Sequence, residues 1–236
     1  MRRTALLGAG ALTAIAGCMV VPVNGMRGTG HFILVIGGLL AVALLVAIGR
    51  EAWRHDRLAA SIARLAIPAT LGERSVGLVP GLGAAVVAGL RRPRIFCADD
   101  LPDRLDAEEL RAVILHEHHH QLEGAPARLV LIGALAPVLC RLDAGRAWME
   151  QERARIEIAA DAYALASGAS RSALASALVK RSSSPGLSVA PGFASAADLR
   201  VRALLGDATG IEGDSSAGRV VASLILVGTC VALYLK

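Results

Sequence analysis

The segment that most constrains this chain is a histidine-rich stretch, Ala112-Val-Ile-Leu-His-Glu-His-His-His-Gln121. Within it, His116, Glu117 and His120 form the pattern H-E-x-x-H. Residues four apart in the sequence lie one turn apart on the same face of an α-helix. The two histidines can therefore bind one Zn²⁺ ion together, while Glu117 stands beside them to activate a water molecule. The spacing predicts a zinc site on a helix.

The flanking residues indicate where this helix begins and ends. Asp106 followed by Glu109 is a capping-box pattern, which places the first helical residue near Ala107. Gly124 and Pro126 are residues that end a helix. The alternative is a solvated, histidine-rich helix end that matches the motif by chance. The capped and apolar helix around the motif favours the metal site.

Two further histidines complicate the assignment of ligands. His118 and His119 lie between the two motif histidines. We interpret them as residues that are not ligands or that surround the ligands, because the motif already supplies a pair at the i and i+4 positions.

A catalytic zinc ion usually has three protein ligands, and in one large class the third is a glutamate from a later helix. The segment Glu157-Ile-Ala-Ala-Asp161 supplies such a glutamate and an aspartate one turn on. The apolar neighbours of Glu157 mean that its carboxylate needs a partner. Asp161 is placed to hydrogen-bond a ligand histidine and fix its orientation. Glu150 and Glu152 are the competing candidates, and we interpret them as part of a solvated helix face.

The composition indicates a membrane protein. Apolar residues make up 54% of the chain and aromatic residues only 3%, which is too apolar for an ordinary soluble domain. The net charge of +5 comes mainly from arginine, without interleaved aromatic residues, so we expect lipid contact and no nucleic-acid binding. The four cysteines form no C-x-x-C pair, and we interpret them as small apolar residues.

Three apolar runs are candidates for membrane spans. The first, in residues 1–23, is either an anchor helix or a signal sequence in which Cys18 would be lipidated, and the length of the run favours the anchor. The second covers residues 31–49, and the third, in residues 219–236, follows a Gly/Asp/Ser linker at 206–218. Arginines before the first run and after the second place residues 50 onward in the cytoplasm by the positive-inside rule.

Residues 50–205 are expected to form one domain on the cytoplasmic side. It should begin with a basic helix over 50–66 at the membrane surface, followed by short strands near 76–79, 84–88 and 92–97. Residues 94–97 are the candidate for an edge strand, either to hold a substrate backbone by strand addition or as a structural edge.

A short apolar helix is expected at residues 127–141. The apolar run within it has 12 residues, from Leu129 to Cys140, and contains Pro137, which makes it short for a span. A single crossing would also separate Glu157 from the histidines. This helix must therefore lie in the membrane interface or re-enter the same side.

Residues 90–180 resemble the integral-membrane zinc metallopeptidases of the BlaR/MecR family, the protease parts of β-lactam sensor-transducers. The resemblance rests on Arg92-Pro-Arg-Ile-Phe96, on the segment from Leu105 to His120, and on Glu157-Ile-Ala-Ala-Asp161 with Tyr163 after it. The related Ste24/heat-shock membrane peptidases share these motifs. The single short apolar run before Glu157 favours the first family, because two full spans are expected there in the second.

The resemblance implies a mainly α-helical membrane protein of the bacterial inner membrane. It implies a gluzincin mini-domain with a small β-sheet, about three transmembrane helices and a cytoplasmic-side active site. His116, His120 and Glu157 would be the zinc ligands and Glu117 the general base. The substrates would be cytoplasmic or membrane-proximal proteins, including a transcriptional repressor, and a separate sensor or repressor protein is an expected partner.

The chain departs from the family pattern in two places. The residues after His120, Gln-Leu-Glu-Gly124, lack the basic and aspartate residues associated with the family, and no penicillin-binding domain follows the last apolar run. We therefore do not expect this polypeptide to sense the antibiotic. Tyr163 is a candidate oxyanion donor, with a simple packing role as the alternative.

Two other classes of protein remain open. One is a non-catalytic regulatory subunit that kept the motif and docks a partner with its basic surface. The other is a metal-storage or metal-sensing membrane protein, in which His118 and His119 would matter as much as the motif pair. The presence of all four expected groups, His116, Glu117, His120 and Glu157, favours the enzyme.

Overall fold

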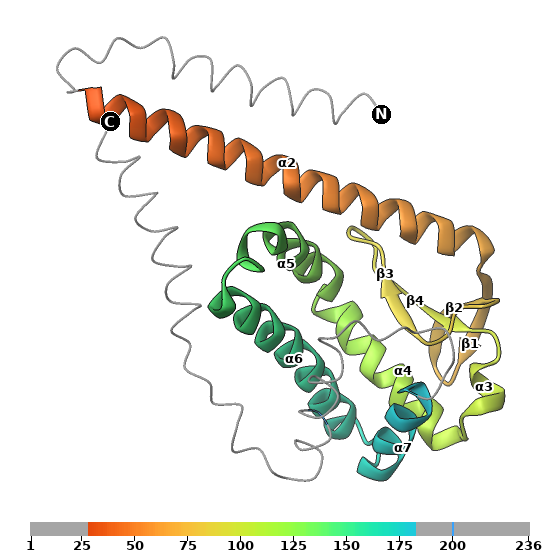
Figure 1. Cartoon of the computed structure of the whole chain (residues 1–236). Helices are drawn as coiled ribbons and strands as arrows, with labels where there is room; N and C mark the ends of the chain where they lie inside the picture. The colour runs from red at the N-terminus through yellow and green to blue at the C-terminus, as the bar shows by residue number, and fades with distance from the viewer. Residues whose placement is uncertain (1–27, 183–199, 201–236) are drawn as a thin grey trace.

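A computed structural model describes residues 28–182 and Arg200 (Figure 1). The elements are α2 (Gly28–Leu65), β1 (Ile67–Leu71), β2 (Arg74–Val79), β3 (Val86–Ala88), β4 (Arg94–Ala98), α3 (Leu101–Arg104), α4 (Ala107–Leu122), α5 (Ala125–Leu139), α6 (Asp143–Ala166) and α7 (Arg171–Ser182). The chain is mainly helical with one small sheet, as the sequence predicts. The expected spans in 1–23 and 219–236, with Cys18 and the linker at 206–218, lie outside the described residues.

Within the described residues, α2 is the one unbroken helix that is long and apolar enough to cross a membrane. The predicted span 31–49 and the predicted basic helix beginning at Arg50 are parts of this one continuous helix. Arg, Glu, Ala and Leu dominate the stretch after Gly49 and are good helix formers, so the helix does not end at that glycine. The exposed side chains of Leu40 and Val46 fit contact with lipid.

The four strands form a mixed sheet in the order β1-β2-β4-β3. β1 and β2 are an antiparallel hairpin, β2 and β4 are parallel, and β3 and β4 are antiparallel. The expectation that residues 94–97 form an edge strand is therefore wrong. Phe96 of β4 is paired with Gly77 on one side and Val86 on the other, so strand addition is impossible there. β1, which the sequence analysis did not predict, tolerates Pro68 because it is an edge strand.

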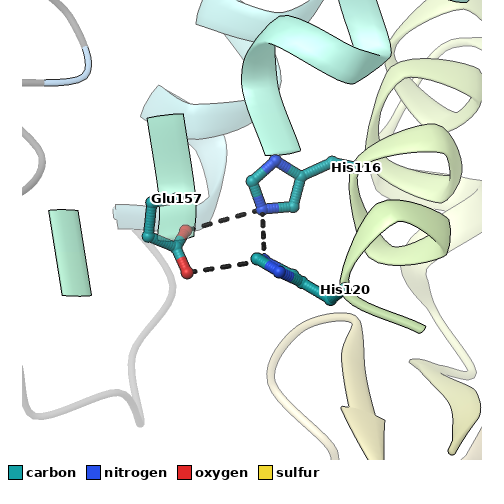
Figure 2. A group of neighbouring side chains, drawn as sticks. All are labelled: His116, His120 and Glu157. Atoms are coloured by element: carbon teal, nitrogen blue, oxygen red, sulfur yellow. Dashed lines mark hydrogen bonds and ion pairs between the residues drawn. The ribbon is translucent and has the colours of Figure 1, made fainter. Parts of the chain in front are cut away.

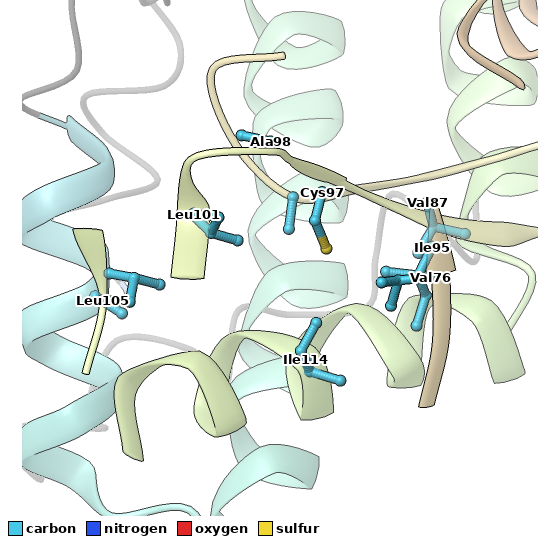
Figure 3. Packing of buried hydrophobic residues seen from close by; sticks show 10 residues of the cluster. Val76, Val87, Ile95, Cys97, Ala98, Leu101, Leu105 and Ile114 are labelled. Carbon is cyan, nitrogen blue, oxygen red and sulfur yellow. The ribbon is translucent and has the colours of Figure 1, made fainter. Parts of the chain in front are cut away.

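The main core lies between the sheet and α4. Val76 from β2, Ile95 and Cys97 from β4, and Ile114 from α4 pack together there (Figure 3). Cys97 has no exposed surface; burial, and then the charge of Glu117, raise the pKa of its thiol to about 12. The thiol therefore stays protonated and serves as an apolar packing group.

On its other side, α4 packs against α6 and α7 through small residues. Ala112 of α4 contacts a cluster that contains Ala164 of α6 and Leu174 of α7. Figure 1 shows α4 between the sheet and α6, with α7 beside the beginning of α4. The motif helix is therefore the central element of the domain. Packing on both of its sides fixes the positions of its side chains.

The predicted ends of the motif helix are confirmed. The side chain of Asp106 accepts a hydrogen bond from the backbone N–H of Glu109 at 2.8 Å, and the Glu109 carboxylate accepts one from Asp106 N–H at 2.9 Å. Two N–H groups that the first turn would leave unpaired are thereby satisfied. The helix ends at Leu122, and Gly124 takes a left-handed φ of 61° before α5 begins.

The apolar helix α5 and the long helix α6 form a hairpin that returns the chain to α4. α5 is bent by 68° from α4, and a short turn at Leu142 leads into α6. Apolar residues at the facing surfaces, Ala125, Ile132, Met149 and Ile156, hold the two helices together. Residues 127–141 were expected not to carry Glu157 away from the two histidines. They do not, because α6 runs back alongside the motif helix.

Candidate metal centre

Three side chains from two helices converge on one point. His116 and His120 project from α4 and Glu157 from α6, with their ring nitrogens and carboxylate turned toward one another (Figure 2). The two Nε2 atoms are 3.0 Å apart, and the carboxylate oxygens of Glu157 lie 3.5 Å from each of them. These three residues are those that the sequence analysis selected as ligands, and together they could hold a metal ion.

The spacing of these atoms fits a small tetrahedral ion. Ligand atoms at about 2.05 Å from a tetrahedral Zn²⁺ are about 3.3 Å from one another. The observed separations of 3.0 to 3.5 Å are close to that value. Two imidazole nitrogens and one carboxylate oxygen are also a donor set that zinc accepts, with a fourth position left for water or substrate. The residues present therefore fit zinc.

Asp161 fixes the orientation of His116, as predicted. Its Oδ1 accepts a hydrogen bond from His116 Nδ1 at 2.8 Å. With the proton on Nδ1, the lone pair of Nε2 points toward the other ligands. Burial alone would lower the pKa of His116, but the contacts with Asp161 and Glu157 raise it to about 9. By contrast, Nδ1 of His120 is buried and has no hydrogen-bond partner among the described residues.

Arg200 completes the site, and the sequence analysis did not identify it. Its Nε and Nη2 atoms donate to the two oxygens of Asp161 at 2.8 Å, and its Nη1 donates to Glu157 Oε2 at 2.9 Å. Burial opposes the charge on both carboxylates, yet their histidine and Arg200 contacts hold the pKa of Glu157 and of Asp161 below the usual values. The histidines and one guanidinium thus together keep the two neighbouring carboxylates ionised.

The sequence contained one signal for such a residue. Glu157 and Asp161 place two carboxylates on one face of a helix with apolar neighbours, and such a pair needs a cation. No spacing rule indicates which of the 25 lysines and arginines supplies it, because the contact depends on tertiary packing.

Glu117 lies at the edge of a cavity that is also lined by His116, one of the three ligand candidates. Its side chain is buried, with 3% of the residue exposed. The cavity has a volume of about 390 Å³, and both His116 and Glu117 line it. A carboxylate in this position is placed to exchange a proton with a molecule held in the cavity.

The remaining candidates lie away from the ligand group. The ring of His119 packs against Tyr163 with a centroid distance of 5.0 Å, and His118 Nδ1 contacts Gln121 Oε1 at 3.3 Å. His118 also faces the Tyr163 ring, which favours the packing role for that tyrosine.

The two competing glutamates are also outside the group. Glu152 pairs with Arg155 at 2.6 Å, and the side chain of Glu150 is exposed. Neither belongs to the cluster that could hold a metal ion, so Glu157 remains the candidate for the third ligand.

Comparison with known proteins gives no family assignment. No family model, no curated protein and no solved structure matches the chain.

Proposed function

We propose that the protein is a membrane-bound, zinc-dependent endopeptidase of the BlaR/MecR type. The observation that carries this proposal is the convergence of His116, His120 and Glu157 at tetrahedral spacing, next to a buried Glu117 and an open cavity. Ligands, a proton-accepting carboxylate and space for a substrate are the parts that a zinc peptidase requires.

Each residue has a definite task in this mechanism. A bound zinc ion would polarise a peptide carbonyl and lower the pKa of a water molecule to about 7. Glu117 accepts a proton from the attacking water on its carboxylate and delivers it to the leaving amine nitrogen. Asp161 keeps the proton of His116 on Nδ1, and Arg200 adds to the histidine contacts that favour the ionised forms of Asp161 and Glu157.

The proposed location rests on α2 and the charge pattern, and the proposed substrates rest on the resemblance to the BlaR/MecR family. α2 supports attachment to a membrane, and the arginines in its second half favour the cytoplasmic side for the domain that follows. Substrates would be cytoplasmic or membrane-proximal proteins, including a transcriptional repressor. A separate sensor protein is proposed as the partner that supplies the activating signal.

Zinc content tests the ligand assignment. We expect about one zinc ion per chain in the detergent-purified protein and a loss of zinc in His120→Ala and in Glu157→Ala, measured by inductively coupled plasma mass spectrometry. Glu152→Ala is the matched control. It also removes a carboxylate from α6, but this carboxylate pairs with Arg155 and does not belong to the candidate metal site. Unchanged zinc in Glu157→Ala would show that the third ligand is another residue.

Cleavage by Glu117→Gln tests the enzymatic role. We expect this variant to keep its zinc and lose peptide hydrolysis by a factor of about 10² to 10⁴, because the general base is removed and the ligands are not. A variant that still cleaves everything the parent cleaves would contradict the mechanism. A protein purified without chelator that holds no zinc would instead favour the non-catalytic regulatory subunit.

A further inference from the structure

We propose that the cavity beside Glu117 is a specificity pocket for an uncharged, apolar side chain of the substrate, next to the bond that is cleaved. This inference rests on the proposed peptidase function and adds the class of residue that the site selects. The cavity lies at the junction of α4, α7, the α3 region and the segment that precedes β3.

The wall of the cavity is mainly apolar. Its larger apolar side chains come from three helical regions and belong to Leu101, Leu105, Val113, Leu174, Leu178 and Val179. Ala84, Ala85 and Ala177 add small apolar surfaces that leave room between these side chains. A wall of this kind favours an apolar guest, since burial removes apolar surface of both partners from water.

The cationic residues in the wall already have acidic partners. Arg104 pairs with Asp100 at 3.1 Å, and Lys180 pairs with Glu109 at 2.6 Å. Arg200 is bound to Asp161 at 2.8 Å. Because each positive charge is matched by a carboxylate of the protein itself, the pocket does not favour an acidic side chain over an apolar one.

The position of the pocket links it to the reacting bond. His116 and Glu117 line the same cavity, and Val113 lies one turn earlier on the same helix. A peptide whose carbonyl lies at the metal centre therefore places a neighbouring side chain against Val113 and the apolar wall. The volume of about 390 Å³ is sufficient for a leucine or phenylalanine side chain.

Binding of peptide hydroxamates tests the pocket without any need for catalysis. The probes are HONH-CO-CH₂-CH(R)-CO-Ala-NH₂ with R as hydrogen, methyl, isobutyl, benzyl or carboxymethyl, titrated calorimetrically into the zinc-loaded full chain. The isobutyl or benzyl probe should bind at least about tenfold more tightly than the hydrogen and carboxymethyl probes. Equal affinity for all five would overturn the pocket while leaving the metal site intact.

Two variants and one control locate the preference. Ala177→Leu should narrow the cavity and reduce the preference for isobutyl over hydrogen by about tenfold, while the hydrogen probe keeps its affinity. Ala175→Leu is the matched control, because it makes the same change on the same helix at a residue that does not line the cavity, and it should keep the preference. Leu178→Ala should shift the preference from isobutyl toward benzyl, which tests the pocket independently if Ala177→Leu does not fold.

The outcomes separate this inference from the proposed function. Melting temperatures show whether the Ala177→Leu and Leu178→Ala variants are folded. If both folded variants keep the preference for the isobutyl probe, the pocket proposal is overturned and the proposed peptidase function is not. Failure of every probe, including the hydrogen one, to bind the zinc-loaded chain would overturn the peptidase site and the pocket with it.

Discussion

At the level of single residues, the metal centre depends on how Asp161 uses its two oxygens. Oδ1 accepts from His116 and from Arg200 Nη2, while Oδ2 accepts from Arg200 Nε. Hydrogen bonds between ionised groups are about twice as strong as neutral ones. The carboxylate is therefore the link between a ligand histidine and the guanidinium that compensates the charge of Glu157.

Asp161→Asn is expected to weaken zinc binding about 10- to 100-fold. An asparagine has one acceptor oxygen, so it loses either the bond that orients His116 or one of its bonds to Arg200. Competition with a chelator of known affinity measures the change. Asp143→Asn, at the start of the same helix and paired with Arg146, should bind zinc like the parent. Equal affinity in both variants would contradict the role of Asp161.

At the level of elements, α7 is tied to the beginning of the motif helix by Glu109. Lys180 donates to its carboxylate at 2.6 Å and Ser176 at 2.5 Å, in addition to the capping box with Asp106. The contact from Lys180, then those from Ser176 and the backbone of Asp106, lower the pKa of Glu109 to about 2. This carboxylate therefore stabilises the fold above its unfolded pKa of about 4.3, and the contribution declines as the pH falls toward 2.

Glu109→Gln should lower stability at pH 7 by about 1–3 kcal/mol. Glutamine can still form the capping box, so the loss of stability measures the contribution of the charged contacts between residue 109 and α7. Thermal unfolding in detergent at several pH values measures it, and the difference from the parent should shrink below about pH 4. The exposed neighbour Glu108→Gln should have little effect at any pH. A deficit in Glu109→Gln that is independent of pH would contradict the ionic contribution.

At the level of the whole molecule, α2 is longer than a membrane is thick. Its 38 residues correspond to a helix of about 57 Å, whereas the hydrocarbon core of a bilayer is about 30 Å thick. The part that follows Gly49 carries the arginines and packs toward the domain, where the side chain of Glu51 lies against Gly133 of α5. Only the apolar first half is therefore expected in the bilayer.

Cysteine labelling tests this division of α2. In a variant without the native cysteines, Val46→Cys should be protected from a membrane-impermeant maleimide in intact vesicles and should react after detergent is added. Leu58→Cys, also exposed on the same helix, should react in inverted vesicles without detergent, because it lies beyond the bilayer. Labelling of Val46→Cys from the aqueous phase would place α2 outside the membrane.

The sequence by itself determined the features that depend on the spacing of residues along one helix or on a capping pattern at its beginning. The i and i+4 spacing placed His116 and His120 together, and the Asp106 and Glu109 pair set the beginning of α4. The apolar surroundings of Glu157 identified it among the acidic residues of its helix. The pairing of the two histidines and the beginning of α4 are confirmed, because each depends on residues within one or two turns.

The tertiary structure alone decided which distant segments meet. It placed Arg200 against Asp161, 39 residues away in the chain, and it placed β4 inside the sheet although residues 94–97 read equally well as an edge. It also formed the cavity beside Glu117 from five separate parts of the chain, one of which is Arg200. Such contacts follow from how apolar faces pack together, and no local spacing encodes them.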